Sequence, residues 1–331
     1  MNNNHSQLTN NNNNRCTDYN KTDMKNGLLT ILGSSCDYFY EADSYPEEGD
    51  FSHAQFKGMM AGGCPLNVGV VCASKGVQVK AMDMLGTDDD TTSFLLSELK
   101  HFNIDTSDIE IHKDVTNGKV IIILSGDKRT MFVVDPKRPS YVMNEKKQEL
   151  LNNATYIYSL MHILNRSFSD MEPLLEAKRN GARIILDGSS KYDDPSRMKI
   201  LYSLCDGLFI NETDYERLKV HSPDDPKKLI FEKGGEFVIV THGSEGSTLY
   251  LKDREIQRSS LNNIEVKDST GAGDAFAGAF LGSLLAGYEY EKALYYATLN
   301  GAYACSVFGA SSTGASFEKL DQFAKEHHYD L

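Results

Sequence analysis

Short apolar runs alternate with amphipathic stretches through most of this chain, and that alternation limits the fold more than any other feature. Apolar runs typical of buried strands lie at 28–32, 77–84, 155–159, 183–186, 207–210 and 237–240. Helices are predicted at 65–76, 91–102 and 168–180, and a glycine ends the first and the last of them. Such alternation favours an α/β fold with a parallel sheet covered by helices on both faces. Ligands bind such sheets at the carboxyl ends of the strands, which here carry Gly33, Asp187, Asn211 and Thr241.

Two segments depart from this alternation. Residues 38–60 carry no helical period, and two β-rich runs between 115 and 135 flank the hairpin signal Ser125-Gly-Asp-Lys128. Residues 1–26 are rich in asparagine, with an unbroken run from Asn10 to Asn14, and are predicted to form a disordered tail. With no internal repeat and no linker, residues 27–331 are predicted to form one domain.

Composition excludes several classes of protein. The chain has 34 Lys and Arg against 47 Asp and Glu, a formal net charge of −13, which disfavours nucleic acid and anionic membranes as partners. Its six cysteines are scattered without a C-x-x-C pair, which is typical of reduced thiols rather than of disulfides or zinc. Neither a secretory signal nor a membrane-spanning run is evident, so we expect a cytoplasmic protein.

A glycine-rich string carries the strongest chemical signal. Residues 268–278 read Asp-Ser-Thr-Gly-Ala-Gly-Asp-Ala-Phe-Ala-Gly, and the apolar run that follows predicts a helix beginning near Asp274. Gly271, Ala272 and Gly273 have minimal side chains, so their N–H groups can close on a ligand. The helix N-terminus adds free N–H groups and a positive dipole end, which suits phosphate. Asp274 itself is either a helix cap or a catalytic carboxylate, and its position alone leaves both open.

A second string stands near the N-terminus and reads Gly62-Gly-Cys-Pro-Leu-Asn67-Val-Gly. The two strings, and their order along the chain, resemble the signatures of the ribokinase-like carbohydrate kinases, also called the PfkB family. Those signatures are D-T-x-G-A-G-D, with Ser269 in place of threonine here, and G-G-x-x-x-N-x-A, with Gly69 in place of alanine. The resemblance covers residues 28 to about 325. It implies a ribokinase-like three-layer α/β sandwich with a mostly parallel central sheet and a small β-lid near 38–60 and 115–135.

The resemblance also implies roles for individual residues. Asp274 is expected to be the catalytic base, beside an anion hole formed by the N–H groups of Gly271, Ala272 and Gly273. The residues expected to bind the sugar are Asp37, Gly62, Gly63 and Asn67. The residues expected to bind ATP are Asn211, Thr241, Gly243, Gly246 and Asn300. Asp214 stands where the family has a glutamate and is expected to contact Mg²⁺ through water, while Asp268 and Thr313 are implied as potassium ligands.

The implied activity is ATP-dependent phosphorylation of a hydroxymethyl group on a free sugar. The resemblance implies Mg²⁺ as a cofactor and K⁺ as a further cation. It also implies a homodimer formed through the lid. A nucleoside kinase is the alternative within the same chemistry. Its base pocket would use Tyr38, Phe39 and Tyr40, although three adjacent aromatic residues rarely share one face of a strand. A non-catalytic sugar or nucleotide sensor is the alternative from another class, but it would not need Asp274. A Rossmann dehydrogenase is disfavoured because Gly33-Ser-Ser-Cys-Asp-Tyr lacks the G-x-G-x-x-G pattern.

Overall fold

The computed structural model describes residues 27–87, 90–126, 128–134, 136–188, 195–221, 225–261, 263–307 and 313–329. The predicted asparagine-rich tail, residues 1–26, lies outside this part of the chain. No helix in the described ranges combines the length and the apolar character needed to cross a bilayer.

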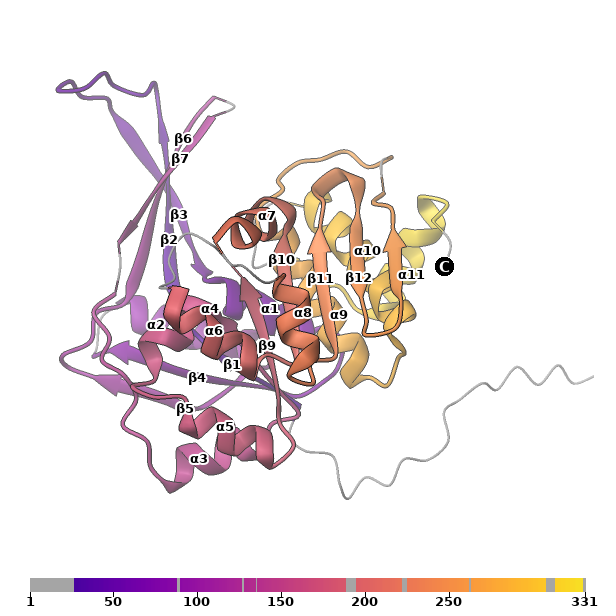
Figure 1. Cartoon of the computed structure of the whole chain (residues 1–331). Coiled ribbons are helices and arrows are strands. Elements are labelled where there is room, and N and C mark those ends of the chain that lie inside the picture. The colour runs from indigo at the N-terminus through magenta and orange to yellow at the C-terminus, as the bar shows by residue number, and fades with distance from the viewer. Residues whose placement is uncertain are drawn as a thin grey trace, which may run out of the picture.

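The larger of two sheets forms the centre of the molecule (Figure 1). Its strands pair in parallel except for the last two along the chain, which pair antiparallel at one edge. In spatial order the described strands are β13 (Glu255–Arg258), β12 (Ser247–Tyr250), β11 (Phe237–Thr241), β10 (Gly207–Asn211), β9 (Arg183–Gly188), β8 (Tyr156–Leu160), β1 (Leu28–Ile31), β4 (Val79–Gly86) and β5 (Asp105–His112). The mostly parallel sheet predicted from the alternation is therefore confirmed.

Helices cover both faces of this sheet and give the molecule three layers. Successive residues of β1 point to opposite faces, so Leu28 and Leu29 belong to two separate buried clusters. One cluster packs the sheet against α3 (Glu145–Asn152), α4 (Met161–Ser167), α5 (Glu172–Arg179), α6 (Pro195–Leu204), α7 (Glu212–His221) and α8 (Pro226–Glu232). The other packs it against α1 (Cys64–Ala73), α2 (Asp90–His101), α9 (Ala272–Leu285) and α10 (Tyr290–Ser306), and α11 (Phe317–Glu326) packs on α10.

One predicted helix has different bounds. The sequence predicted a helix over 168–180, whereas the helix in that range, α5, begins only at Glu172, and α4, which ends at Ser167, was not predicted. Pro173 lies in the first turn of α5, where its fixed φ and missing N–H are tolerated. The helix therefore begins close to the proline, four residues later than the apolar pattern predicted.

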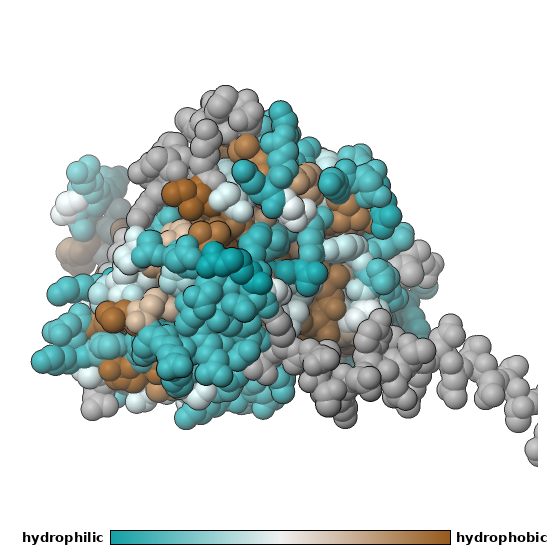
Figure 2. Space-filling model, turned by 60° about the horizontal axis from the view of Figure 1, so that its bottom comes forward, coloured by the Kyte–Doolittle hydropathy of each residue, from teal (hydrophilic) through white to brown (hydrophobic). Residues whose placement is uncertain are grey.

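The second sheet stands away from the three layers as a lid (Figure 1). Its described strands lie in the spatial order β3 (Ala54–Gly62), β2 (Ser35–Ala42), β6 (Gly118–Ser125) and β7 (Lys128–Val134). They coincide with the two segments in which the sequence predicted lid strands. Several of the larger exposed apolar side chains lie here, at Phe56, Met131, Phe132 and Val133. By contrast, the underside of the molecule is mostly hydrophilic, with hydrophobic residues in small separate patches (Figure 2).

Candidate active site

The glycine-rich string forms the turn that leads into α9. Gly271 adopts a left-handed conformation with φ 75°, which a residue with a side chain adopts only under strain. Before it, the N–H and hydroxyl groups of Thr270 both donate to Asp268 Oδ1, at 2.9 and 2.6 Å. A Cβ at Gly273 would meet no atom within 4 Å, so this residue borders open space. The Ala272 N–H donates to the Ser269 carbonyl at 3.3 Å. Since the first N–H groups of a helix have no intrahelical partner, the start of α9 still offers donors to a ligand.

Asp274 lies in the first turn of α9, and two side chains from α1 hold its carboxylate. Asn67 Nδ2 donates to Asp274 Oδ2 at 2.7 Å, and the Cys64 thiol also hydrogen-bonds to this carboxylate. Burial raises the pKa of Asp274, while the hydrogen bonds from Cys64 and Asn67 lower it. The buried Asn67 Oδ1 has no hydrogen-bond partner among the described residues. A buried acceptor without a partner is costly, so it suits a hydroxyl donor from a ligand.

A chain of polar groups continues from Asp274 into the core. Cys64 Sγ lies 3.4 Å from Tyr158 Oη, and the Tyr158 hydroxyl donates to Asp187 Oδ2 at 3.0 Å. Burial, followed by the negative charge of Asp274, raises the pKa of Asp187 to about 7. The sequence singled out Asp187 only as a strand end, and nothing in the local pattern distinguishes Tyr158 or Cys64 from ordinary core residues.

The predicted sugar residues meet where β2, β3 and α1 adjoin. Asp37 accepts a hydrogen bond from Ser35 Oγ at 3.0 Å, and burial raises its pKa more than this bond lowers it. A Cβ on Gly62 would overlap the Asp37 carboxylate, and one on Gly63 would lie 3.0 Å from the Gly33 carbonyl oxygen. Both glycines are thus required by close approach. The tertiary structure brings Asp37, Gly62 and Gly63 to the start of the helix that carries Asn67.

Three of the five predicted ATP residues line a cavity of about 480 Å³, which we call the nucleotide cavity. They are Thr241, Gly243 and Gly246, at the end of β11 and in the loop after it, and the start of α9 adds Ala272 and Gly273 to the lining. Most of the remaining lining is apolar or small, including Leu261, Phe276 and Ala302. A volume of this size is typical of small-molecule sites. The nucleotide loop and two of the three predicted anion-hole residues, Ala272 and Gly273, therefore share one cavity.

Asn211 and Asp214 lie beside this cavity, at the end of β10 and the start of α7. Asn211 pairs in register with Thr241, its Nδ2 donates to Asp214 Oδ2 at 2.8 Å, and Arg217 Nη1 lies 3.2 Å from Asp214 Oδ1. Within the described ranges, no group of three or more His, Cys, Asp or Glu side chains is placed to hold a metal ion. Mg²⁺ bound here would take most of its ligands from phosphate oxygens and water, which is the usual arrangement for this ion.

The structure corrects the prediction for Asn300. Its side chain is fully buried: Oδ1 accepts from Lys75 Nζ at 2.6 Å, and Nδ2 donates to the Thr313 carbonyl at 2.8 Å. The next residues along α10, Gly301 and Ala302, line the nucleotide cavity instead. Asn300 therefore anchors the segment around Thr313 rather than facing an adenine. Residues 308–312, directly before the implied potassium ligand Thr313, lie outside the described ranges.

The lid reaches the glycine-rich turn through one side chain that the sequence did not single out. Arg129 of β7 hydrogen-bonds to the Thr270 hydroxyl, and its Nη1 lies 3.8 Å from Asp268 Oδ1. This contact links a strand of the lid to the residues that precede the anion hole.

Comparison with known proteins agrees with this arrangement. The family model described as pfkB family carbohydrate kinase matches residues 27–316. A 5-dehydro-2-deoxygluconokinase of Shouchella clausii is 23% identical over 288 residues, which cover 81% of this chain and 87% of that protein. The structure of Arabidopsis thaliana ribokinase with ribose and ATP superposes with a TM-score of 0.78 at 22% identity, covering 91% of this chain and 99% of that one. A putative ribokinase II from E. coli with ATP and Mg²⁺ gives 0.74 at 20% identity, covering 91% and 99%. At these identities the structural matches show the ribokinase-like fold.

Proposed function

This chain belongs to the pfkB family of carbohydrate kinases, and from that premise we propose that it transfers the γ-phosphoryl group of ATP to a hydroxymethyl group of a free sugar. One observation carries the proposal: the Asp274 carboxylate lies at the start of α9 directly after Gly273, which borders the nucleotide cavity, and accepts a hydrogen bond from Asn67. A carboxylate beside the N–H donors of a helix N-terminus suits a reaction in which a proton leaves an alcohol while negative charge grows on phosphate.

The proposed step uses residues of this chain in three roles. Asp37 and Asn67 bind sugar hydroxyls and orient the reacting one, with Asn67 Oδ1 as the free acceptor. Asp274 takes the proton of the sugar's hydroxymethyl group while the hydroxymethyl oxygen forms a bond to the γ-phosphorus of ATP. The bond from that phosphorus to the bridging oxygen of ADP breaks in the same displacement, and ADP leaves. The N–H groups of the Gly271–Asp274 turn stabilise the charge on the transferred group.

The cations belong to the proposal as well. Asp214, with Asn211, is the residue that would contact a magnesium ion through water, and the ion would neutralise charge on the ATP phosphates. Asp268 and the segment of Thr313 would contact a potassium ion. The hydrogen bonds from Thr270 to Asp268 keep that carboxylate at the glycine-rich turn. Exclusion of water during transfer is assigned to the lid, which Arg129 already joins to Thr270.

Two alternatives are less well supported. A nucleoside kinase needs a site for the base, yet Tyr38 donates to or accepts from Thr91 at 3.0 Å and the Tyr40 ring packs against Phe56 with centroids 5.5 Å apart. These aromatic residues are engaged within the structure rather than grouped as one pocket. A non-catalytic sensor would not need Asp274 buried and hydrogen-bonded beside an anion hole.

We also propose a homodimer through the lid. Strand β7 exposes Met131, Phe132, Val133 and Val134 in succession, with exposed fractions between 47 and 68%. A second copy of the same lid would cover such a strand by burying its apolar side chains. Light scattering at several concentrations tests this, and a monomer at all of them would contradict it.

The function is tested by an ATP-consumption screen over free pentoses, hexoses, ketoses, sugar acids and nucleosides, with Asp274→Asn as the control enzyme. We expect sugar-dependent ADP release by the wild type alone. Absence of turnover with every compound, from protein that binds ATP, would contradict the proposal.

A further inference from the structure

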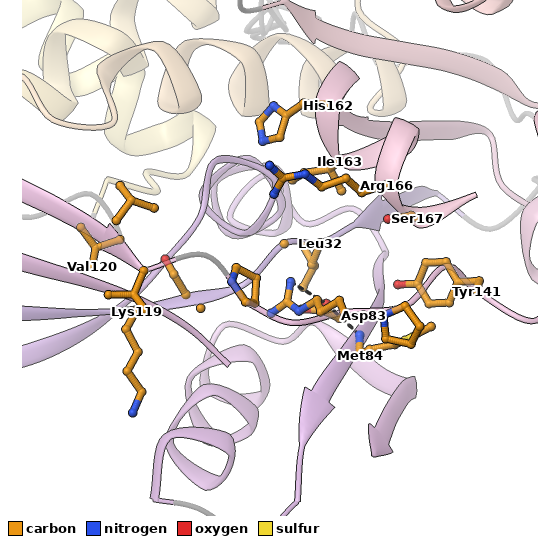
Figure 3. Close-up of a pocket in the computed structure, with 18 residues that line it drawn as sticks. Leu32, Asp83, Met84, Lys119, Val120, Tyr141, His162, Ile163, Arg166 and Ser167 are labelled. Carbon is orange, nitrogen blue, oxygen red and sulfur yellow. Dashed lines mark hydrogen bonds and ion pairs between the residues drawn. The ribbon is translucent and has the colours of Figure 1, made fainter. Parts of the chain in front are cut away.

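Asp83 and Asp187 are carboxylates that the proposed mechanism does not use, and they differ in their partners. Asp83 lies at a cavity of about 180 Å³ beneath the lid, which Arg138 and Arg166 also border (Figure 3). There, Arg138 Nη1 is 3.3 Å from the Asp83 carboxylate. Asp187, half-buried in β9, has no basic partner within the described ranges. A carboxylate withdrawn from water without such a partner is costly, which makes Asp187 a candidate for a functional role.

A continuous series of hydrogen-bonding groups joins Asp187 to the proposed base Asp274. The Cys64 thiol at the start of α1 hydrogen-bonds to the Asp274 carboxylate, and Cys64 Sγ lies 3.4 Å from Tyr158 Oη. The Tyr158 hydroxyl in turn donates to Asp187 Oδ2 at 3.0 Å. Tyr158 is fully buried in β8, with its ring centroid 6.5 Å from that of Phe209, so packing holds the hydroxyl in this position.

The two middle groups of this series can pass a proton but do not release their own at neutral pH. Burial, followed by the negative charges of Asp274 and Asp187, raises the pKa of the Cys64 thiol well above its ordinary value. Burial and the charge of Asp187 raise the pKa of the Tyr158 hydroxyl in the same way. Each group therefore keeps one hydrogen to donate, and each also has a lone pair that accepts one.

The surroundings of the two carboxylates favour a proton on Asp187 over one on Asp274. Hydrogen bonds from Cys64 and Asn67 stabilise the ionised form of Asp274 and lower its pKa. Asp187 has one such bond, from Tyr158, and the negative charges of Asp274 on α9 and Asp214 on α7 both raise its pKa. Because Asp187 is only half-buried, it can afterwards release the proton to water.

We infer that Cys64, Tyr158 and Asp187 form a proton relay that removes from Asp274 the proton taken from the sugar; this inference rests on the kinase function proposed above. The proton on Asp274 passes to Cys64 Sγ while the thiol proton passes to Tyr158 Oη and the phenol proton passes to Asp187 Oδ2. Cys64 and Tyr158 each gain one proton and lose one, so Asp274 becomes ionised again and Asp187 becomes neutral.

The relay acts while the products are still bound. A protonated Asp274 is the acid that the reverse transfer needs, since it would return its proton to the sugar oxygen. Movement of that proton to Asp187 leaves the bound ADP and sugar phosphate without this acid, so the forward direction is favoured. The path runs through side chains inside the domain and therefore does not require the lid to admit water.

Tyr158→Phe interrupts the relay by removing one hydroxyl, and it does not touch Asp274. With MgATP and the free sugars of the screen above, D-ribose first, kcat should fall about 10-fold, as the loss of a hydrogen bond to a charged group implies, while both KM values change little. The wild-type kcat should also rise with pH through a step at the Asp187 pKa of about 7, because the acceptor must be ionised, and this step should be absent in Tyr158→Phe. Tyr156→Phe is the matched control, since it removes a buried hydroxyl from the same face of β8, and it should keep both kcat and the step.

Two variants of Cys64 give the second test. Cys64→Ser keeps a group that donates and accepts, so it should retain the step near pH 7, whereas Cys64→Ala should lose it as Tyr158→Phe does. A step that persists in both Tyr158→Phe and Cys64→Ala, even with a lower melting temperature, would overturn the relay and leave a kinase whose Tyr158 only stabilises the core. Loss of the step in Tyr156→Phe would also overturn it. A wild type that turns over no compound of the screen would overturn the kinase function, and the relay with it.

Discussion

Replacement of Asp274 by asparagine separates the two roles that are open to this carboxylate. Asparagine cannot accept the alcohol proton, so turnover should fall by about two to four orders of magnitude, which is the usual contribution of a general base. That loss corresponds to about 3–5 kcal/mol of activation free energy. ATP binding should persist, because the N–H groups of Gly271 and Gly273 remain.

The effect on stability should be small because two changes oppose each other. The charge-assisted hydrogen bond from Asn67 at 2.7 Å becomes a neutral one, a loss of about 1–2 kcal/mol. Burial raises the pKa of Asp274 above its unfolded value, so the ionised carboxylate destabilises the folded state as pH rises through that pKa. Asparagine removes this second contribution. The net shift in melting temperature should therefore be only a few degrees.

Steady-state kinetics and thermal melting of one purified variant measure both quantities. Asp90→Asn is the matched control, since it makes the same substitution in the first turn of α2, where the side chain is exposed, and it should leave turnover unchanged. A lower melting temperature with near-normal turnover in Asp274→Asn would identify Asp274 as a helix cap only and refute the mechanism.

Four further outcomes are expected. Turnover should rise with pH through a midpoint above the ordinary aspartate range, because the base must be ionised and burial raises the Asp274 pKa; a midpoint near 4 in the kcat profile would contradict this. Asp37→Ala should raise the KM for the sugar and leave the KM for ATP nearly unchanged. Asn67→Ala should also lower kcat, because the Asn67 amide donates to the base Asp274. A variant that changed only the KM for ATP would show that the sugar and ATP ends of the site are assigned the wrong way round. Potassium should increase the rate over a bulky organic cation at equal ionic strength, and equal rates would remove the potassium site. Deletion of residues 1–25 should leave kcat and melting temperature unaltered, and a large loss in either would show that this segment docks on the domain.

Much of the architecture could be predicted from local patterns. A strand buried on both faces needs a continuous apolar run, and a helix needs a period of 3.6 residues, so both types of element are visible wherever burial is complete. The antiparallel strands β12 and β13 were not predicted for two different reasons. The edge strand β13 is exposed at alternate residues and has little apolar signal, whereas β12 is mostly buried but begins with Ser and Thr, so its four residues form no continuous apolar run. The helix predicted at 168–180 begins later than expected, at Glu172, for another local reason, the proline in the first turn of α5.

In the candidate active site, too, local sequence determined some features and tertiary packing determined others. The sequence by itself determined the glycine-rich turn, because backbone geometry there depends on residues that lack a side chain, and it therefore singled out Gly271 and Asp274 together. Only the tertiary structure decided that Asn300 turns inward to Lys75, since the direction of a helical side chain depends on what packs against it. It also decided that Tyr158 joins Cys64 to Asp187, and that Arg138 and Arg166 border one cavity. These groups are far apart along the chain, and the order β8-β1-β4 in the sheet brings them together. That order results from the packing of whole strands and helices, which no local pattern of residues records.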